Sequence, residues 1–124
     1  MEDFPHKELT YKIIGICMEV HNNLGTGFSE IVYKDAIEFE LKNQNIQFER
    51  EKEFTVKYKE TVLNHKFYAD FVINDQVIIE IKSVKEFKDE FYAQCINYLK
   101  ISELKIALLV NFGKTKLDYK RIIY

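Results

Sequence analysis

The chain has 124 residues, of which 47% are hydrophobic and 31% charged, and its formal net charge is −2. This length suits one globular domain over residues 1–124, and the eight Tyr and ten Phe exclude a disordered chain. No apolar run approaches the roughly 20 residues that a membrane span requires, and the first residues lack the layout of a secretory signal, so we expect a cytoplasmic protein without membrane contact.

Charge is distributed unevenly along the chain. Residues 1–81 hold nine Lys/Arg against fifteen Asp/Glu, whereas residues 82–124 hold nine against five. The acidic total is not typical of a nucleic-acid-binding protein. A basic C-terminal part can still attract phosphate, although these lysines can equally serve only to keep the surface soluble.

Two helices are predicted at the start of the chain. Apolar residues recur every three or four positions over residues 7–23, and again over residues 29–45. Gly25 suits the left-handed position that follows a helix, and Ser29 is a good N-cap for the second helix. Cys17 and Cys95 both fall in helical apolar patterns, which predicts buried free thiols rather than a disulfide.

Three strands follow as an antiparallel meander. Residues 46–59, 62–73 and 76–83 are rich in β-forming residues, and short turns at residues 59–61 and 74–75 separate them. A bulge is expected near Glu53. The third strand is almost continuously apolar, which predicts a central position covered on both faces.

A third helix over residues 88–100 leads to a buried strand at residues 104–111 and to an edge strand at residues 117–124. The helical connection makes a crossover with parallel pairing the expected arrangement. The sequence thus predicts an α/β fold of order ααβββαββ, in which helices flank a mixed central sheet.

Three charged residues interrupt the apolar strands. Glu80 and Lys82 are two apart and must share a face, and Asp70 lies on the preceding strand. Two carboxylates close together repel unless a cation lies between them, and Mg²⁺ commonly takes one or two carboxylates while keeping its waters. The neighbouring ammonium would stabilise a phosphate transition state or hold the attacking water. The alternative is a solvent-facing strand with a weak cross-strand ion pair.

The order of these elements resembles the PD-(D/E)xK nuclease superfamily, with its restriction-endonuclease-like core. In addition, Gly27-Phe28-Ser29-Glu30-Ile31-Val32-Tyr33 resembles the signature of the GxxExxY proteins, a prokaryotic group placed in that superfamily. The likeness covers nearly the whole chain. One departure is Ala69, which stands where the superfamily name has Pro.

The resemblance implies a role for each matching residue. Asp70 and Glu80 would bind Mg²⁺ or Mn²⁺, with the main-chain carbonyl of Ile81 as a further ligand. Lys82 would be the catalytic lysine. Glu30 would approach the metal directly or through water, or would only complement the positive end of its helix.

Other residues are candidates for contact with the site or the substrate. Gln94 and Tyr98 match a Gln-x-x-x-Tyr element, which implies a catalytic role for Gln94, although a helical Gln can equally be a surface residue. Tyr98, Tyr33 and His21 are candidate substrate contacts, although His21 can instead close the end of its helix.

The first functional hypothesis is a divalent-metal-dependent nuclease that hydrolyses phosphodiester bonds, in DNA rather than RNA. The alternative is a non-catalytic module that binds nucleic acid or protein, with a homodimer as one assembly, because so small an acidic domain offers little surface for a long duplex. A third hypothesis is hydrolysis of a small nucleotide.

Overall fold

The computed structural model describes residues 4–124, which form three helices and five strands. In chain order the elements are α1 (Lys7–Leu24), α2 (Glu30–Asn43), β1 (Phe48–Tyr58), β2 (Thr61–Ile73), β3 (Val77–Lys82), α3 (Asp89–Ser102), β4 (Ile106–Asn111) and β5 (Asp118–Ile123). This order, ααβββαββ, confirms the fold class that the sequence predicts.

The strands form one mixed sheet in the order β1-β2-β3-β4-β5. β3 and β4 are parallel, and the other neighbours are antiparallel. The parallel pair is joined through α3, as expected because parallel neighbours need a long crossover connection. β3 is therefore the central strand, with the antiparallel β1–β2 hairpin on one side and β4–β5 on the other.

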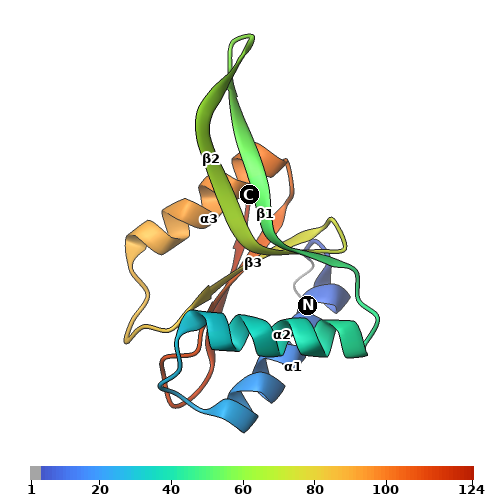
Figure 1. Cartoon of the computed structure of the whole chain (residues 1–124), viewed down its shortest axis with the longest axis vertical. Helices are drawn as coiled ribbons and strands as arrows, with labels where there is room; N and C mark the ends of the chain where they lie inside the picture. The colour runs from blue at the N-terminus through green and yellow to red at the C-terminus, as the bar shows by residue number, and fades with distance from the viewer. Residues whose placement is uncertain (1–3) are drawn as a thin grey trace.

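The helices cover opposite faces of the sheet (Figure 1). α1 and α2 pack on the face that carries Ile79 and Ile81, whereas α3 packs on the face that carries Ile78. Since side chains alternate along a strand, Glu80 and Lys82 leave β3 on the α3 side. The two buried clusters thus set the direction of both charged side chains.

β1 and β2 form a long hairpin whose tip extends well beyond the rest of the molecule (Figure 1). The alternation of side chains breaks within this hairpin at Asp70. Ala69 packs with the α3 cluster, but Phe71, two residues later, packs with the α1–α2 cluster. The chain therefore changes faces at Asp70.

The matching irregularity in β1 lies at Glu51, which has a φ of 54° between residues that pair regularly with β2. Left-handed backbone at a residue other than Gly costs about 1–2 kcal/mol. Irregularities do occur near Glu53, where the sequence predicts one. Glu53 itself pairs regularly with Tyr68, but Glu51 has the left-handed φ and the register shifts between Thr55 and Lys57. The side chains of β1 are mostly exposed or half-buried, so the apolar alternation of its sequence does not give the exact position of an irregularity.

A buried amide connects the ends of β3 and β4. Asn111 is fully buried, and its Oδ1 accepts hydrogen bonds from the backbone N–H groups of Val84 (3.0 Å) and Gly113 (2.9 Å). Its Nδ2 donates to the Val84 carbonyl at 2.9 Å. A Cβ added at Gly113 would clash with backbone atoms of Val84. The segment after Lys82 is therefore held firmly against the end of β4.

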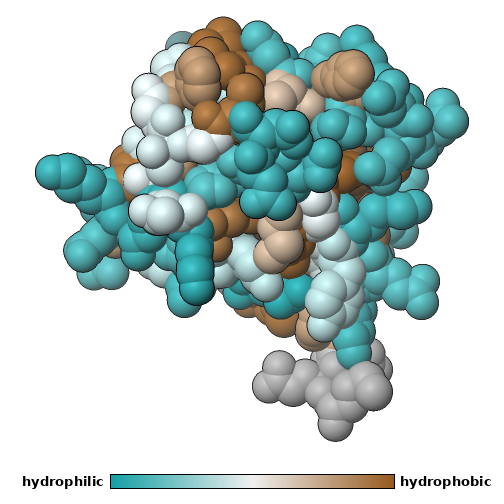
Figure 2. Space-filling view, turned by 90° about the horizontal axis from the view of Figure 1, so that it is seen from below, coloured by the Kyte–Doolittle hydropathy of each residue, from teal (hydrophilic) through white to brown (hydrophobic). Residues whose placement is uncertain are grey.

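The surface opposite the hairpin tip is mostly hydrophilic, with apolar groups scattered among the polar ones (Figure 2). Within residues 4–124, no helix combines the length and apolar character needed to cross a bilayer. Cys17 and Cys95 are buried free thiols, as the sequence predicts, and burial raises the pKa of each to about 12.

The contact at Gly113 predicts a loss of stability on adding one methyl group. We expect Gly113→Ala to lower the free energy of unfolding by about 2 kcal/mol or more, because the Val84 backbone must move. The matched control is Gly15→Ala in the exposed face of α1, where a Cβ meets nothing within 4 Å. That change should raise stability by about 0.5–1 kcal/mol. Urea denaturation measures both, and equal effects of the same sign would contradict this account.

Candidate active site

The site lies in a fork where β2 leaves β3. Backbone pairing between these strands runs from Ile73↔Val77 to Phe71↔Ile79 and covers no residue beyond them. Past this point two side-chain carboxylates take the place of the backbone hydrogen bonds between β2 and β3. The Asp70 N–H donates to Glu80 Oε1 at 3.0 Å, and the Ile81 N–H donates to Asp70 Oδ2 at 2.7 Å. These reciprocal bonds hold both side chains in the opening of the fork.

Both carboxylates are buried, with only 8% of Asp70 and 3% of Glu80 exposed. Burial, and after it the negative charge of Asp70, raises the pKa of Glu80 to about 8. Among the described residues, Glu80 has one hydrogen bond and no ion pair. Ionising both of these adjacent buried carboxylates at once is therefore unfavourable, because few positive groups offset their charges.

Lys34 on α2 supplies the one direct ion pair to this centre within residues 4–124. Its Nζ lies 2.8 Å from Asp70 Oδ1 and 2.9 Å from Glu51 Oε1. Burial lowers the pKa of Lys34, but its hydrogen bonds to Asp70 and Glu51 outweigh this effect and raise it. The sequence interpretation missed Lys34. Its spacing of four residues from Glu30, which places both on one helix face, was the available signal.

Lys82 points to the α3 side and is oriented by a chain of polar groups. Its Nζ donates to Gln94 Oε1 at 3.4 Å and lies 4.6 Å from the centre of the Phe91 ring. Gln94 Nε2 donates to the Tyr98 hydroxyl at 3.2 Å, and that hydroxyl donates to the Tyr68 carbonyl at 2.9 Å. Because an ammonium only donates, it fixes the orientation of the Gln94 amide.

Tyr98 is 3% exposed, and burial together with the Glu80 charge raises its pKa. Its single hydroxyl is used to connect Gln94 on α3 to the backbone of β2. The structure therefore places Gln94 and Tyr98 together with Lys82 and gives Tyr98 a positioning contact inside the protein.

Glu30 is the first residue of α2 and is half-buried. Ser83 Oγ donates to the Phe28 carbonyl at 3.2 Å, which brings the start of α2 to the end of β3. Within the described residues, however, Glu30 does not form a cluster of three potential metal ligands with Asp70 and Glu80. The structure thus brings two carboxylates together directly and leaves the third on a neighbouring element.

Tyr33 and His21 occupy internal positions. Tyr33 is fully buried, stacks on Phe112 with ring centres 4.5 Å apart, and donates to the Gly25 carbonyl at 2.6 Å. His21 is 7% exposed and its Nε2 is 2.8 Å from the Lys114 carbonyl, to which it must donate. These contacts hold the ends of α1 and β4. Tyr33 is enclosed in the core, whereas His21 also lines a cavity with Met18 and Asn22.

The Asp70–Glu80 pair fits a divalent cation. Mg²⁺ or Mn²⁺ prefers carboxylate oxygens and retains several waters, so two carboxylates suffice. A cation would neutralise the repulsion that raises the pKa of Glu80. Ile81, whose main-chain carbonyl is the further ligand that the resemblance implies, donates its N–H to Asp70.

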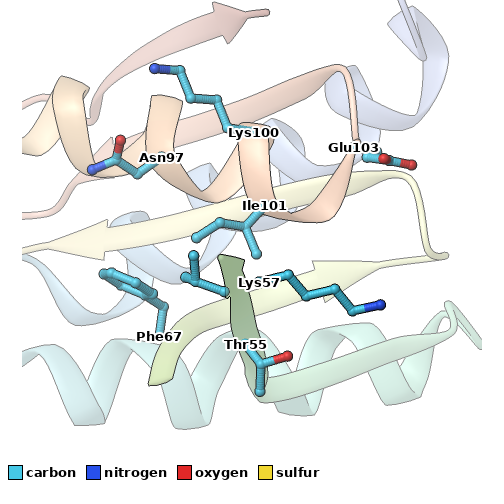
Figure 3. Close-up of a pocket in the computed structure, with 8 residues that line it drawn as sticks. Thr55, Lys57, Phe67, Asn97, Lys100, Ile101 and Glu103 are labelled. Carbon is cyan, nitrogen blue, oxygen red and sulfur yellow. The ribbon is translucent and has the colours of Figure 1, made fainter. Parts of the chain in front are cut away.

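A groove lies beside the site, between the hairpin and α3, with a volume of about 680 Å³. Phe67 and Ile101 provide its apolar surface, while Lys57 and Lys100 extend to either side of Ile101 (Figure 3). The Phe67 ring contacts that of Tyr98 edge-on, with centres 6.2 Å apart. Phe67 thus connects the groove to Tyr98 of the polar chain that orients Lys82.

The raised pKa of Glu80 predicts an unusual dependence of stability on pH in the presence of a chelator. Folding raises this pKa from 4.5 to about 8, so the folded state binds the proton more tightly. The resulting stability is complete below pH 4.5 and is lost as the pH rises through 8. Glu80→Gln keeps the shape but cannot ionise.

We expect Glu80→Gln to exceed the unsubstituted protein in stability at about pH 9 by on the order of 2 kcal/mol, and to show a flatter profile from about pH 5 upward. Urea denaturation in EDTA at several pH values measures this. Glu60→Gln, in the exposed hairpin turn, serves as the control. Parallel profiles for Glu80→Gln and the unsubstituted protein would contradict the assigned pKa shift.

Comparisons with solved structures agree with this fold. The crystal structure of SSO0001 superposes with a TM-score of 0.59 at 22% identity, covering 74% of this chain and 49% of that one. This chain thus spans about half the length of that protein. The alkaline exonuclease LHK-Exo from Laribacter hongkongensis gives a TM-score of 0.55 at 12% identity, covering 98% of this chain and 72% of its own.

Among the curated proteins, none matches this sequence. The family model for the PD-(D/E)XK nuclease superfamily, in contrast, matches residues 7–122 and so includes every residue of the fork. With nearly the whole chain matched and the fold in agreement, the chain belongs to the PD-(D/E)XK nuclease superfamily.

Proposed function

We propose that this chain is a divalent-metal-dependent nuclease that hydrolyses phosphodiester bonds, in DNA rather than RNA. The observation that carries the proposal is the pair of buried carboxylates in the fork, with Lys82 leaving the same strand two residues later. Superfamily membership supports nucleic acid as the substrate class. Membership of the narrower GxxExxY group remains a prediction from the motif around Glu30.

In this proposal Asp70 and Glu80 hold Mg²⁺ or Mn²⁺, with the Ile81 carbonyl as a further ligand and Glu30 acting through water. The bound ion would supply charge neutralisation of the phosphate and acidify a water. The protein holds Asp70 and Glu80 in place through backbone N–H groups before any substrate arrives. Such prior orientation lowers the barrier because no reorganisation is needed during the reaction.

Lys82 would hold the attacking water or donate to the phosphate oxygens that gain charge. Gln94 limits the freedom of the Lys82 ammonium, and Tyr98 in turn orients Gln94. These two residues are positioning residues in this scheme. The face of the Phe91 ring attracts the Lys82 ammonium and further limits its position.

Replacing the central charges tests the activity directly. We expect Asp70→Asn and Lys82→Ala each to lower metal-dependent cleavage by at least about 100-fold, because each removes a group that acts on the reacting phosphate. Asp75→Asn and Lys85→Ala, which are matched charge changes at exposed positions, should leave cleavage unchanged. The assay compares single-stranded DNA, duplex DNA, RNA and dinucleotides in Mg²⁺ and Mn²⁺, with circular dichroism to verify folding.

Absence of cleavage of every substrate by the unsubstituted protein would favour the alternative, a non-catalytic binding module. Cleavage of dinucleotides alone would favour hydrolysis of a small nucleotide. Gel filtration of the same samples determines whether the homodimer predicted for the module exists.

The groove beside the site predicts where the substrate continues. We expect Lys57→Ala/Lys100→Ala to weaken DNA binding in Ca²⁺ and to flatten its dependence on salt by about one unit of slope per lost phosphate contact. Lys12→Ala/Lys42→Ala removes two exposed lysines from α1 and α2 and is the control. Fluorescence anisotropy at several salt concentrations measures both slopes, and equal slopes would exclude the groove as the binding path.

A further inference from the structure

We propose that Lys34 is a built-in competitor of the divalent cation: its ammonium occupies the cation's place at Asp70 and passes to Glu51 when the ion binds. This inference rests on the proposed metal-dependent function and adds a residue to its site. Neither the motif around Glu30 nor the Asp70–Glu80–Lys82 set includes Lys34.

The first support is the identity of the oxygen that Lys34 contacts. Among the described residues, Asp70 Oδ2 accepts the Ile81 N–H and Oδ1 accepts no backbone N–H, so Oδ1 is the more available oxygen for a cation. Lys34 Nζ lies 2.8 Å from that Oδ1 atom. An ammonium and a metal ion cannot both bind one carboxylate oxygen at close range without strong repulsion, so binding of either disfavours the other.

The second support is the burial of this contact. The side chains of Lys34 and Asp70 are only 14% and 12% exposed, so solvent screens their attraction weakly. Lys34 therefore provides the direct ion pair of Asp70, whereas Glu80 has no ion pair among the described residues.

The third support is a second acceptor in reach of the same ammonium. Glu51 Oε1 lies 2.9 Å from Lys34 Nζ, and the Glu51 side chain is 49% exposed. Lysine has a flexible stem and three donors, so it can leave Asp70 while keeping Glu51. The ammonium would then move outward without losing its charged partner.

The backbone of Glu51 favours this arrangement. Its φ of 54° interrupts β1 next to the residues that pair with Phe71 and Ala69, on either side of Asp70. Unfavourable backbone of this kind persists where the surrounding structure requires it, and it is concentrated at functional sites. The residue with this backbone, Glu51, is also the one that contacts Lys34 opposite Asp70.

Calorimetric titration with Mn²⁺ alone tests the proposal without any substrate. We expect Lys34→Gln to bind Mn²⁺ at least about fivefold more tightly than the unsubstituted protein, because the competing charge is gone. Its melting temperature in EDTA should fall, and the rise on adding Mn²⁺ should be larger. The control is Lys42→Gln on the same helix, which breaks an exposed ion pair with Glu38 and should change neither quantity.

Glu51→Gln provides a second test at an exposed side chain, in case Lys34→Gln does not fold. Loss of the receiving carboxylate should weaken Mn²⁺ binding, opposite in sign to Lys34→Gln. The double variant should bind like Lys34→Gln alone, because Glu51 acts only through the ammonium. A further loss of affinity in the double variant would instead make Glu51 a metal ligand and would overturn the transfer step.

The outcomes separate this inference from the proposed function. Mn²⁺ binding that is equal or weaker in Lys34→Gln would overturn the inference alone and would make Lys34 a support for Asp70. Absence of Mn²⁺ binding in both proteins would overturn the inference together with the metal dependence of the proposed function. Binding by Lys34→Gln but not by the unsubstituted protein would support the inference most strongly.

Discussion

The reciprocal hydrogen bonds between Asp70 and the β3 segment at Glu80 and Ile81 are the constraint on which the site depends. Where β2 separates from β3, backbone groups would lose their ladder partners, and buried unpaired groups are costly. The carboxylates replace those partners. The hydrogen bonds that satisfy these backbone N–H groups therefore hold two carboxylates close together in a buried site. The same bonds thus bring two negative charges into mutual repulsion.

Three elements relieve or exploit this concentration of negative charge. α2 contributes Lys34 from one face of the sheet, while β3 and α3 hold Lys82 on the other through Gln94 and Tyr98. The buried Asn111 amide fixes the segment that follows Lys82. β3 thus holds charged side chains while the apolar clusters on both faces of the sheet stay buried. This arrangement explains how so small a domain accommodates the site.

Much of this arrangement could be predicted from the sequence, because periodicity is a local signal. The alternation in β3 correctly predicted that Glu80 and Lys82 share a face and that β3 is central, and the crossover through α3 predicted its parallel neighbour. The contacts of Lys34 and the irregular backbone of Glu51 could not be predicted this way. Both depend on where α2 crosses the hairpin. The spacing of Lys34 from Glu30 indicates a shared helix face, but not the distance from that face to Asp70 and Glu51. Tyr33 shows the same limit, since its motif position did not reveal that its hydroxyl holds Gly25.

The most direct test of the account is a crystal grown in MnCl₂ with diffraction data recorded at the manganese absorption edge. The account predicts one anomalous peak bonded to both Asp70 and Glu80, with the Lys34 ammonium no longer on Asp70. A fork without such a peak, in which Lys34 still contacts Asp70 at saturating Mn²⁺, would contradict the central claim that these carboxylates form a metal site.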